Sequence, residues 1–494
     1  MLEVVLAFIK TGFGSIFILL LGVLGTKIFA FYLGPEGVGL FSLLRAARDT
    51  FFSLTSFNGG TALVQGLASR QGIFRKRYGL VVLIIMVLDT VVVIPILIIF
   101  APQIASSVFH RSDPVSVAYI RWLTVPVVLD TILNYLTDTL TGYRAIGRLV
   151  LVQLISAIVT AGLAYPVTLL VKSGHSIAFI GMMAASSFMG IWLAFEFVRR
   201  AKWLPLVGKH EAEVNRATLI GDGKYFLSFA FTMFVVGLAN TWTILAVRSA
   251  ITAAMGLSAA GVFDVAWTLS MMYVSLALSS FASYYLPKFA QSTNDEDRRQ
   301  IITRIFRMAL IIIVPIITAI ILFKPLIVKI LYSAEFISSL QIIRWMLMGD
   351  YLKTTTWVFG VTITASADKK VLLWTELSWQ AGFLLLSLIS LYIFKSIAGI
   401  GSIFVILNLG HLCYTTYYVH SRFGFRLSRS LVLQWLGGLA LLLSLSTITW
   451  NSLNIQWIVI LIGGGFVILY VALFFTADER TQLLRMVNQR FSRK

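Results

Sequence analysis

The stretch LGPEGVGLF (Leu33–Phe41) joins two apolar runs, each long enough to cross a bilayer as a helix. A second stretch, LSAAGVF (Leu257–Phe263), joins two further long apolar runs. An offset of 222 residues superposes Gly39 on Gly261 and also aligns the phenylalanines that end both stretches. Each stretch follows one long helix and begins the next, so the pattern predicts an internal repeat.

The composition is typical of a membrane protein. The chain has 494 residues, of which 58% are hydrophobic and 12% are charged, and its mean hydropathy is +0.89. Soluble domains are about one quarter charged, and disordered chains combine low hydrophobicity with high charge density, so both classes are excluded. The apolar runs are too long and continuous for the alternating strands of a membrane barrel. We predict an all-α polytopic protein with fourteen transmembrane helices at 6–33, 38–69, 79–100, 115–142, 149–171, 176–198, 225–255, 259–289, 305–323, 340–366, 369–394, 398–420, 430–449 and 455–476.

The basic residues indicate how the chain is oriented. The net charge is +19, but the cations lie in short loops, which favours membrane headgroups over nucleic acid as their partner. With the N-terminus in the cytoplasm, 28 cations in loops, termini and adjoining span ends lie on the cytoplasmic side, and five lie on the opposite side. This bias predicts that both termini are cytoplasmic.

Cys413 is the single cysteine, so no intrachain disulfide can form.

The repeat and the longest polar connection predict the domain organisation. Residues 1–198 form an N-terminal six-helix lobe, 199–224 a cytoplasmic linker, and 225–420 a C-terminal six-helix lobe. Residues 421–494 add two helices and a basic cytoplasmic tail. Because six is even, both lobes run the same way through the membrane. Their pseudo-twofold axis is then expected along the membrane normal, with a site between the lobes.

At this point the chain resembles a known family. The stretch Phe31–Phe41, followed by Arg45 and by the FNGG stretch at 57–60, resembles the N-terminal region of polysaccharide transporters. These are the O-antigen and enterobacterial-common-antigen flippases of the multidrug/oligosaccharidyl-lipid/polysaccharide (MOP) exporter superfamily. The two extra C-terminal helices depart from the usual twelve spans and are similar to those of lipid II flippases, where they form a groove for the lipid tail. The resemblance implies a bacterial inner-membrane protein of lipopolysaccharide or surface-polysaccharide synthesis, whose partners are a polyprenyl-diphosphate-linked oligosaccharide, membrane lipids and the polymerase machinery.

Cations inside the predicted spans are the candidate ligands for the diphosphate of such a lipid. Lys27, Arg45, Arg48 and Arg248 are predicted near the outer parts of their helices. A guanidinium group matches phosphate oxygens in bidentate geometry. The alternatives stay open: Arg45 has Asp49 four residues away on the same helix face, and Lys27 and Arg248 could extend to the interface. Arg48 has no acidic residue three or four positions away, which favours a role in binding.

Carboxyl groups inside spans are costly and are candidates for ion coupling. Asp89 and Asp130 are expected near the membrane midplane on antiparallel neighbours, where two carboxyl groups would suit proton or cation binding. The alternative for this pair is a polar contact between helices, and Asp350 could instead bridge to Lys353. The candidates for ion coupling are Asp49, Asp89, Asp130, Asp264, Asp350 and Glu376.

Two tryptophans are candidates for stacking on sugar rings, Trp242 and Trp267, although core packing is the alternative for both. We found no phosphate-binding loop and no metal-ligand cluster in the sequence. We therefore expect a transporter without cofactor that is not an enzyme, driven by a H⁺ or Na⁺ gradient or by consumption of its product.

Three functions fit these features, in this order. The first is a flippase that moves an undecaprenyl-diphosphate-linked oligosaccharide to the outer leaflet by alternating access through a cationic central cavity. The second is an ion-coupled drug/cation antiporter of the same superfamily, which should have an acidic or apolar lumen. The third is a membrane glycosyltransferase or polymerase, which usually needs a large extramembrane loop that this chain lacks.

Overall fold

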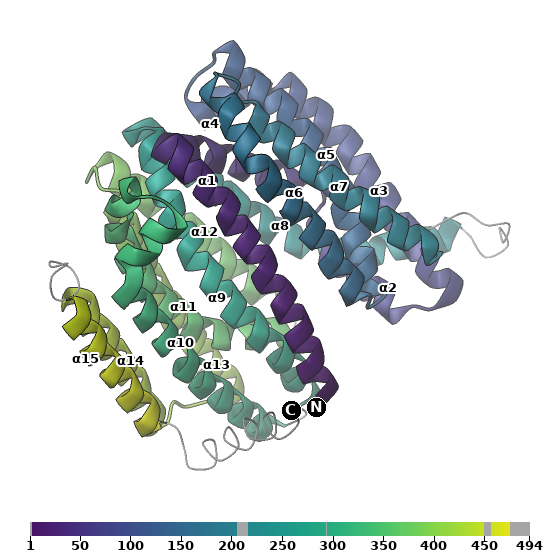
Figure 1. Cartoon of the computed structure of the whole chain (residues 1–494). Coiled ribbons are helices and arrows are strands. Elements are labelled where there is room, and N and C mark those ends of the chain that lie inside the picture. The colour runs from purple at the N-terminus through teal and green to yellow at the C-terminus, as the bar shows by residue number, and fades with distance from the viewer. Residues whose placement is uncertain (1, 205–215, 293, 367, 449–455, 475–494) are drawn as a thin grey trace, which may run out of the picture. The chain divides into compact units, whose positions relative to one another are not determined.

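The computed structural model describes residues 2–204, 216–292, 294–366, 368–448 and 456–474 (Figure 1). All regular structure in these ranges is helical. Eleven of the described helices are long and apolar enough to cross a membrane. The chain is therefore a polytopic α-helical membrane protein. The count of fourteen spans and the bounds of the four predicted segments remain predictions, and the basic tail at 475–494 lies outside the described residues.

The chain divides into two compact units. The first contains Met1–Asp264, Leu331–Phe336 and Glu376–Lys395, and the second contains Val265–Ile330, Ile337–Thr375 and Ser396–Lys494. Helices up to residue 255 belong to the first unit: α1 (Leu2–Thr55), α2 (Gly60–Ser69), α3 (Gly72–Ile99), α4 (Ala101–Phe109), α5 (Pro114–Gly142), α6 (Ile146–Lys172), α7 (Ala178–Arg200) and α8 (Arg216–Met255). The remaining elements are α9 (Leu257–Gln291), α10 (Asp295–Leu331), the 3₁₀ helix η2 (Ala334–Ser339), α11 (Leu340–Ala365), α12 (Lys369–Tyr392), α13 (Ala398–Phe423), α14 (Arg429–Ile448) and α15 (Gln456–Phe474).

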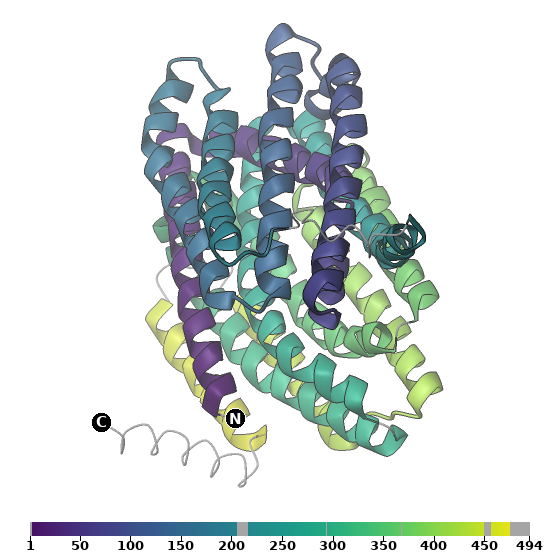
Figure 2. The same ribbon diagram turned by 90° about the vertical axis from the view of Figure 1, so that its right-hand side faces the viewer.

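The Gly34-Pro35 pair divides α1 into two helical segments. Gly34 has φ 62° and ψ −165°, which is not helical and which a residue with a side chain rarely adopts. Pro35 lacks a backbone N–H and is suited to the first turn of the segment that follows. The purple helix in Figure 2 rises from the N-terminus and then changes direction at this bend. The stretch identified in the sequence therefore turns the chain without a long loop.

The two stretches that the sequence superposes are in direct reciprocal contact. A methyl group added to Gly39 would overlap the carbonyl of Leu257, and one added to Gly261 would overlap the carbonyl of Pro35. Pro35 and Leu257 are also 222 residues apart, so they are repeat partners as Gly39 and Gly261 are. Gly39 touches Leu257, and the repeat partner of Gly39 touches the repeat partner of Leu257. This is the pattern expected at a local twofold axis. Gly39 and Gly261 thus let the second segment of α1 touch the start of α9 backbone to backbone.

The buried core of the first unit holds α2, α3, α5 and α8 together. Leu67, Tyr78, Leu136 and Phe226 are almost completely buried in one cluster. The Tyr78 hydroxyl donates a hydrogen bond to the carbonyl of Ala62 over 2.9 Å, which satisfies its polar atom inside the core. This cluster fixes α2 and α5, which also carry the candidate site described below.

We expect alanine at Gly39 or Gly261 to destabilise the protein, because the added methyl group has no space between the two backbones. Overpacking of this kind costs about 1–3 kcal/mol. The measurement is thermal unfolding of the purified protein in detergent. Gly162→Ala is the control, since Gly162 lies inside α6 with no atom within 4 Å of the added methyl group. Equal melting temperatures for all three variants and the wild type would contradict the close contact.

Candidate functional site

Three arginines and three aspartates form a charged cluster in the first unit, which we call the ionic cluster. Its members come from α1, α5, α8 and the start of α9: Arg45, Arg48, Asp49, Asp130, Arg248 and Asp264. When every member is ionised, three positive and three negative charges cancel. The charges of this cluster are therefore balanced, and the cationic central cavity expected from the sequence remains a prediction.

Asp264 is the shared acceptor in the buried half of the cluster. Its Oδ1 accepts a hydrogen bond from Arg45 Nη2 over 3.2 Å and forms a second ion pair with Arg248 Nη2. The side chains of Arg248 and Asp264 are only 4% and 3% exposed. Arg248 also donates from Nη1 to the carbonyl of Ser42 over 3.4 Å. Burial of a guanidinium group needs such compensation, since an unpaired charge in a low dielectric is strongly unfavourable.

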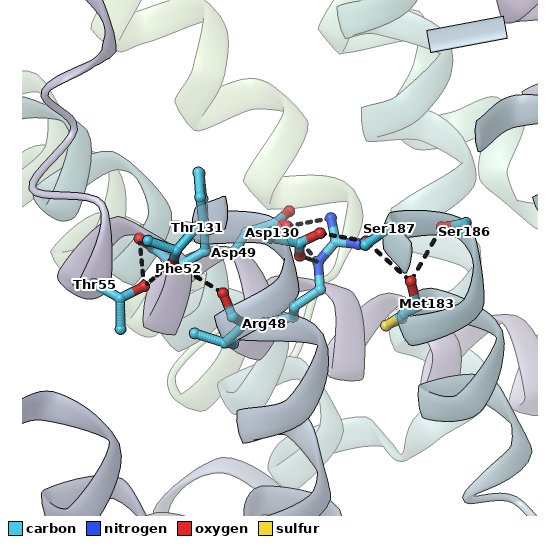
Figure 3. Close-up of polar contacts among 10 residues, drawn as sticks. Arg48, Asp49, Phe52, Thr55, Asp130, Thr131, Met183, Ser186 and Ser187 are labelled. Atoms are coloured by element: carbon cyan, nitrogen blue, oxygen red, sulfur yellow. Dashed lines mark hydrogen bonds and ion pairs between the residues drawn. The ribbon is translucent and has the colours of Figure 1, made fainter. Parts of the chain in front are cut away.

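Arg48 is the centre of the more open half of the cluster (Figure 3). It donates to Asp49 Oδ1 from Nη2 over 2.8 Å and from Nε over 3.1 Å, and its Nε lies 3.5 Å from Asp130 Oδ2. Asp130 accepts a further hydrogen bond over 2.5 Å from the hydroxyl of Ser187 on α7. The side chains of Arg48 and Asp49 are 26% and 43% exposed. This half can therefore exchange a carboxylate for another anion at a lower cost than the buried half can.

The pairing differs from the pairs that the sequence indicated. Arg45 does not pair with Asp49 but with Asp264, which is 219 residues away in the sequence. Arg48, which has no acidic residue at helical spacing, pairs with its immediate neighbour and with α5. Arg248 is buried rather than extended to an interface. Helical spacing failed here because the direction of each side chain depends on which neighbouring helix faces it.

Four other predicted site residues do not belong to the ionic cluster, and their predicted roles in binding or coupling stay predictions. Lys27 is half-buried on the first segment of α1, and Glu376 is half-buried on α12. Trp242 on α8 is 53% exposed. Trp267 packs edge to face on Phe404, with ring centroids 6.1 Å apart, in agreement with its packing alternative.

The two remaining carboxyl candidates have contrasting surroundings. Asp89 does not form the expected pair with Asp130, whose charged neighbours are Arg48 and Asp49, and Asp89 Oδ2 is buried without a hydrogen-bond partner in the described part of the chain. In the second unit, Asp350 is fully buried and accepts hydrogen bonds from Ser270 over 2.8 Å and from Tyr273 over 2.6 Å. Roles in ion coupling remain predictions for both.

A polar pocket next to the ionic cluster was not predicted from the sequence. It has a volume of about 430 Å³ and is lined by α1, α2, α5 and the turn between α1 and α2. Its polar lining includes Asn58, Asn134 and Asp138. The sequence held two signals for it. The FNGG stretch interrupts an apolar run, and polar residues recur every four positions on α5 at Asp130, Asn134 and Asp138.

We expect Asp264→Asn to destabilise the protein by about 3–5 kcal/mol, because it leaves Arg248 buried without its charged partner. Asp49→Asn is the control and should cost at most about 1 kcal/mol, since the Asp49 side chain is 43% exposed and Arg48 keeps Asp130 as a partner. Replacement of both buried partners, Arg248→Met with Asp264→Leu, should cost less than Asp264→Asn alone. Denaturation of the purified protein would measure all three variants against the wild type. Equal stability of Asp264→Asn and Asp49→Asn would contradict the buried pair.

Comparison with known proteins agrees with this architecture. The family model described as polysaccharide biosynthesis protein matches residues 32–341, which is more than half of the chain. Lipid III flippases of Escherichia coli (strain K12) and Shigella flexneri are each 22% identical over 364 residues, covering 72% of this chain and 84% of their own length.

Solved structures share the fold at low sequence identity. The lipid II flippase MurJ, in an inward closed conformation, has a TM-score of 0.70 at 14% identity and covers 94% of this chain and 98% of its own. An inward-facing multidrug resistance MATE family transporter of the MOP superfamily has a TM-score of 0.65 at 14% identity, covering 82% and 94%. The family model covers more than half of the chain, so the chain belongs to the family described as polysaccharide biosynthesis protein.

Proposed function

We propose that this protein is a flippase for a polyprenyl-diphosphate-linked oligosaccharide, which it moves from the cytoplasmic to the outer leaflet of a bacterial inner membrane. The family and its lipid III flippase relatives support the class of substrate. The observation that carries the proposal is Arg48, a partly exposed guanidinium group held by carboxylates inside a membrane helix. A diphosphate offers the same kind of oxygen acceptor with more negative charge.

In this mechanism, the diphosphate replaces aspartate as the partner of Arg48 and Arg45. Asp49 is the first partner to leave, because it is the most exposed carboxylate of the cluster. The Arg248–Asp264 pair stays buried and holds α8 against α9. After the headgroup is released, the aspartates pair with the arginines again. The guanidinium groups then never face a low dielectric without an anion, which keeps both end states accessible.

The protein makes and breaks no covalent bond in this scheme, so it is a transporter rather than an enzyme. Alternating access carries the headgroup across while the polyprenyl chain remains in lipid. A H⁺ or Na⁺ gradient, or removal of the product by the polymerase machinery, drives the direction. Both termini are cytoplasmic in this arrangement, as the loop cations predict.

The second candidate function is an ion-coupled drug/cation antiporter. The fold likeness to a MATE family transporter and the three aspartates of the ionic cluster favour it over a glycosyltransferase or polymerase. An antiporter would use the carboxylates to bind its cationic substrate, and the arginines would oppose that binding. Loss of drug resistance in a deletion strain with normal surface glycan would support the antiporter and reject the flippase.

We expect Arg48→Ala to reduce surface glycan at least about tenfold in a deletion strain that expresses the variant, because hydrogen bonds to charged groups contribute about 1.5–3 kcal/mol. Arg48→Lys should give an intermediate level, since an ammonium group keeps the charge but lacks the bidentate fork. Arg121→Ala is the control, because Arg121 is an exposed arginine on α5. Glycan output is normalised to the amount of protein in the membrane. Full output from Arg48→Ala would remove the proposed role.

A further inference from the structure

The polar pocket beside the ionic cluster has the chemistry of a sugar site. Seven of its side chains carry hydrogen-bonding groups: Ser56, Asn58, Thr61, Gln65, Asn134, Asp138 and Thr141. Amides both donate and accept, hydroxyls do the same, and the carboxylate accepts. A sugar ring presents hydroxyl groups that need such a mixture. An apolar drug would leave these hydrogen-bonding groups unpaired.

The size of the pocket also favours a ring. Its volume is about 430 Å³, whereas one water needs only about 10–15 Å³ of such space. A dehydrated cation at Asp138 would leave most of this volume unused. The pocket therefore suits a ligand the size of a monosaccharide or larger.

The position of the pocket relative to Arg48 matches the covalent structure of the proposed substrate. On α1, Phe52 of the pocket follows Arg48 by four residues. On α5, Asn134 and Asp138 follow Asp130 by four and eight residues. Four residues are about one helical turn, or roughly 6 Å along the axis. In a lipid-linked oligosaccharide the first sugar is bonded directly to the second phosphate, so a diphosphate at Arg48 leaves its first sugar within this distance.

The turn that contributes Asn58 is held in an unfavourable conformation. Phe57 and Asn58 have φ values of 52° and 43°, in the left-handed region that a bulky residue such as phenylalanine rarely adopts. The Phe57 ring stacks on Phe234 of α8, with centroids 4.4 Å apart and an interplanar angle of 6°. Asn58 Nδ2 donates to Ser53 Oγ over 2.5 Å. The surrounding contacts thus hold this turn against its local preference and keep Asn58 in the pocket wall.

The carboxylate of the pocket is oriented in advance. Asn134 Nδ2 donates to Asp138 Oδ2 over 2.9 Å, which leaves Asp138 Oδ1 and the side-chain Oδ1 of Asn134 as acceptors. Gly60 lies directly against this carboxylate, since a methyl group there would contact Asp138. Fixed acceptors bind a hydroxyl group with less loss of side-chain entropy than mobile ones.

From these observations we infer that the pocket formed by α1, α2 and α5 binds the first sugar of the lipid-linked oligosaccharide while Arg48 binds its diphosphate. This inference rests on the proposed function. It assigns the ionic cluster to the diphosphate, which every polyprenyl diphosphate carries, and the pocket to the sugar, which only the glycosylated lipid carries.

The test measures binding to the full chain in nanodiscs, with radiolabelled farnesyl diphosphate and with the same lipid carrying one sugar. The sugars are glucose, galactose, N-acetylglucosamine and N-acetylgalactosamine. We expect at least one sugar to increase the affinity of the wild type about tenfold or more over bare farnesyl diphosphate. Asn134→Ala and Asp138→Asn should each remove most of this gain without changing the affinity for the bare lipid. Arg48→Ala should weaken the binding of both kinds of probe.

Two further variants separate a binding defect from a folding defect. Gln65→Ala changes an exposed pocket residue on α2, and Gln153→Ala changes an exposed glutamine on α6 outside the pocket. Gln65→Ala should lower the gain from the sugar, and Gln153→Ala should leave it intact. If the bare lipid binds through Arg48 but no sugar adds affinity, or if the pocket variants weaken both probes equally, the sugar site is wrong and the flippase proposal stands. If neither probe binds, or if Arg48→Ala binds both as the wild type does, the proposed function fails as well.

Discussion

The buried carboxylate of Asp264 is the interaction on which the charged site depends. It lies between Arg45 and Arg248, and it compensates a guanidinium group that has almost no contact with solvent. Without that carboxylate, the protein would have to hydrate Arg248 or deform the helices around it, and both are costly. The pair therefore fixes α8 against the start of α9 and leaves Arg45 and Arg48 as the arginines that can change partner.

The glycine contact makes this pairing geometrically available. Gly39 and Gly261 bring the second segment of α1 and the start of α9 together at backbone distance. Asp264 follows Gly261 by three residues and Arg45 follows Gly39 by six, so both side chains emerge within two turns of the contact. A larger residue at either glycine would separate the helices and lengthen the ion pair. The repeated small residue and the ionic cluster are thus parts of one arrangement.

Much of the fold was predictable because its determinants are local. Long apolar runs predict helices, and the Gly34-Pro35 pair predicts where one helix stops and the next begins. The superposition of Gly39 on Gly261 predicted a repeat, whereas the contact between these two segments came only from the structure. The partners of Arg45 and Arg48 were not predictable in this way, since Asp264 and Asp130 lie on other helices whose rotation a single sequence does not reveal. Asp89 and Asp130 illustrate the same limit, because similar predicted depth in the membrane does not make two residues neighbours.

The ionic cluster and the polar pocket would divide substrate recognition between them. Arginines attract any diphosphate, so they contribute affinity but cannot distinguish a bare lipid carrier from a loaded one. The hydrogen-bonding groups of the pocket contribute little to the binding of a ligand that lacks hydroxyls. A site built to bond hydroxyl groups discriminates strongly against such a ligand. The pocket adjoins the cluster on the same two helices, α1 and α5. The arginines and the pocket would therefore contact the diphosphate and the sugar of one bound headgroup. A transporter with this division could bind the diphosphate of every lipid carrier and still favour the carriers that hold a sugar.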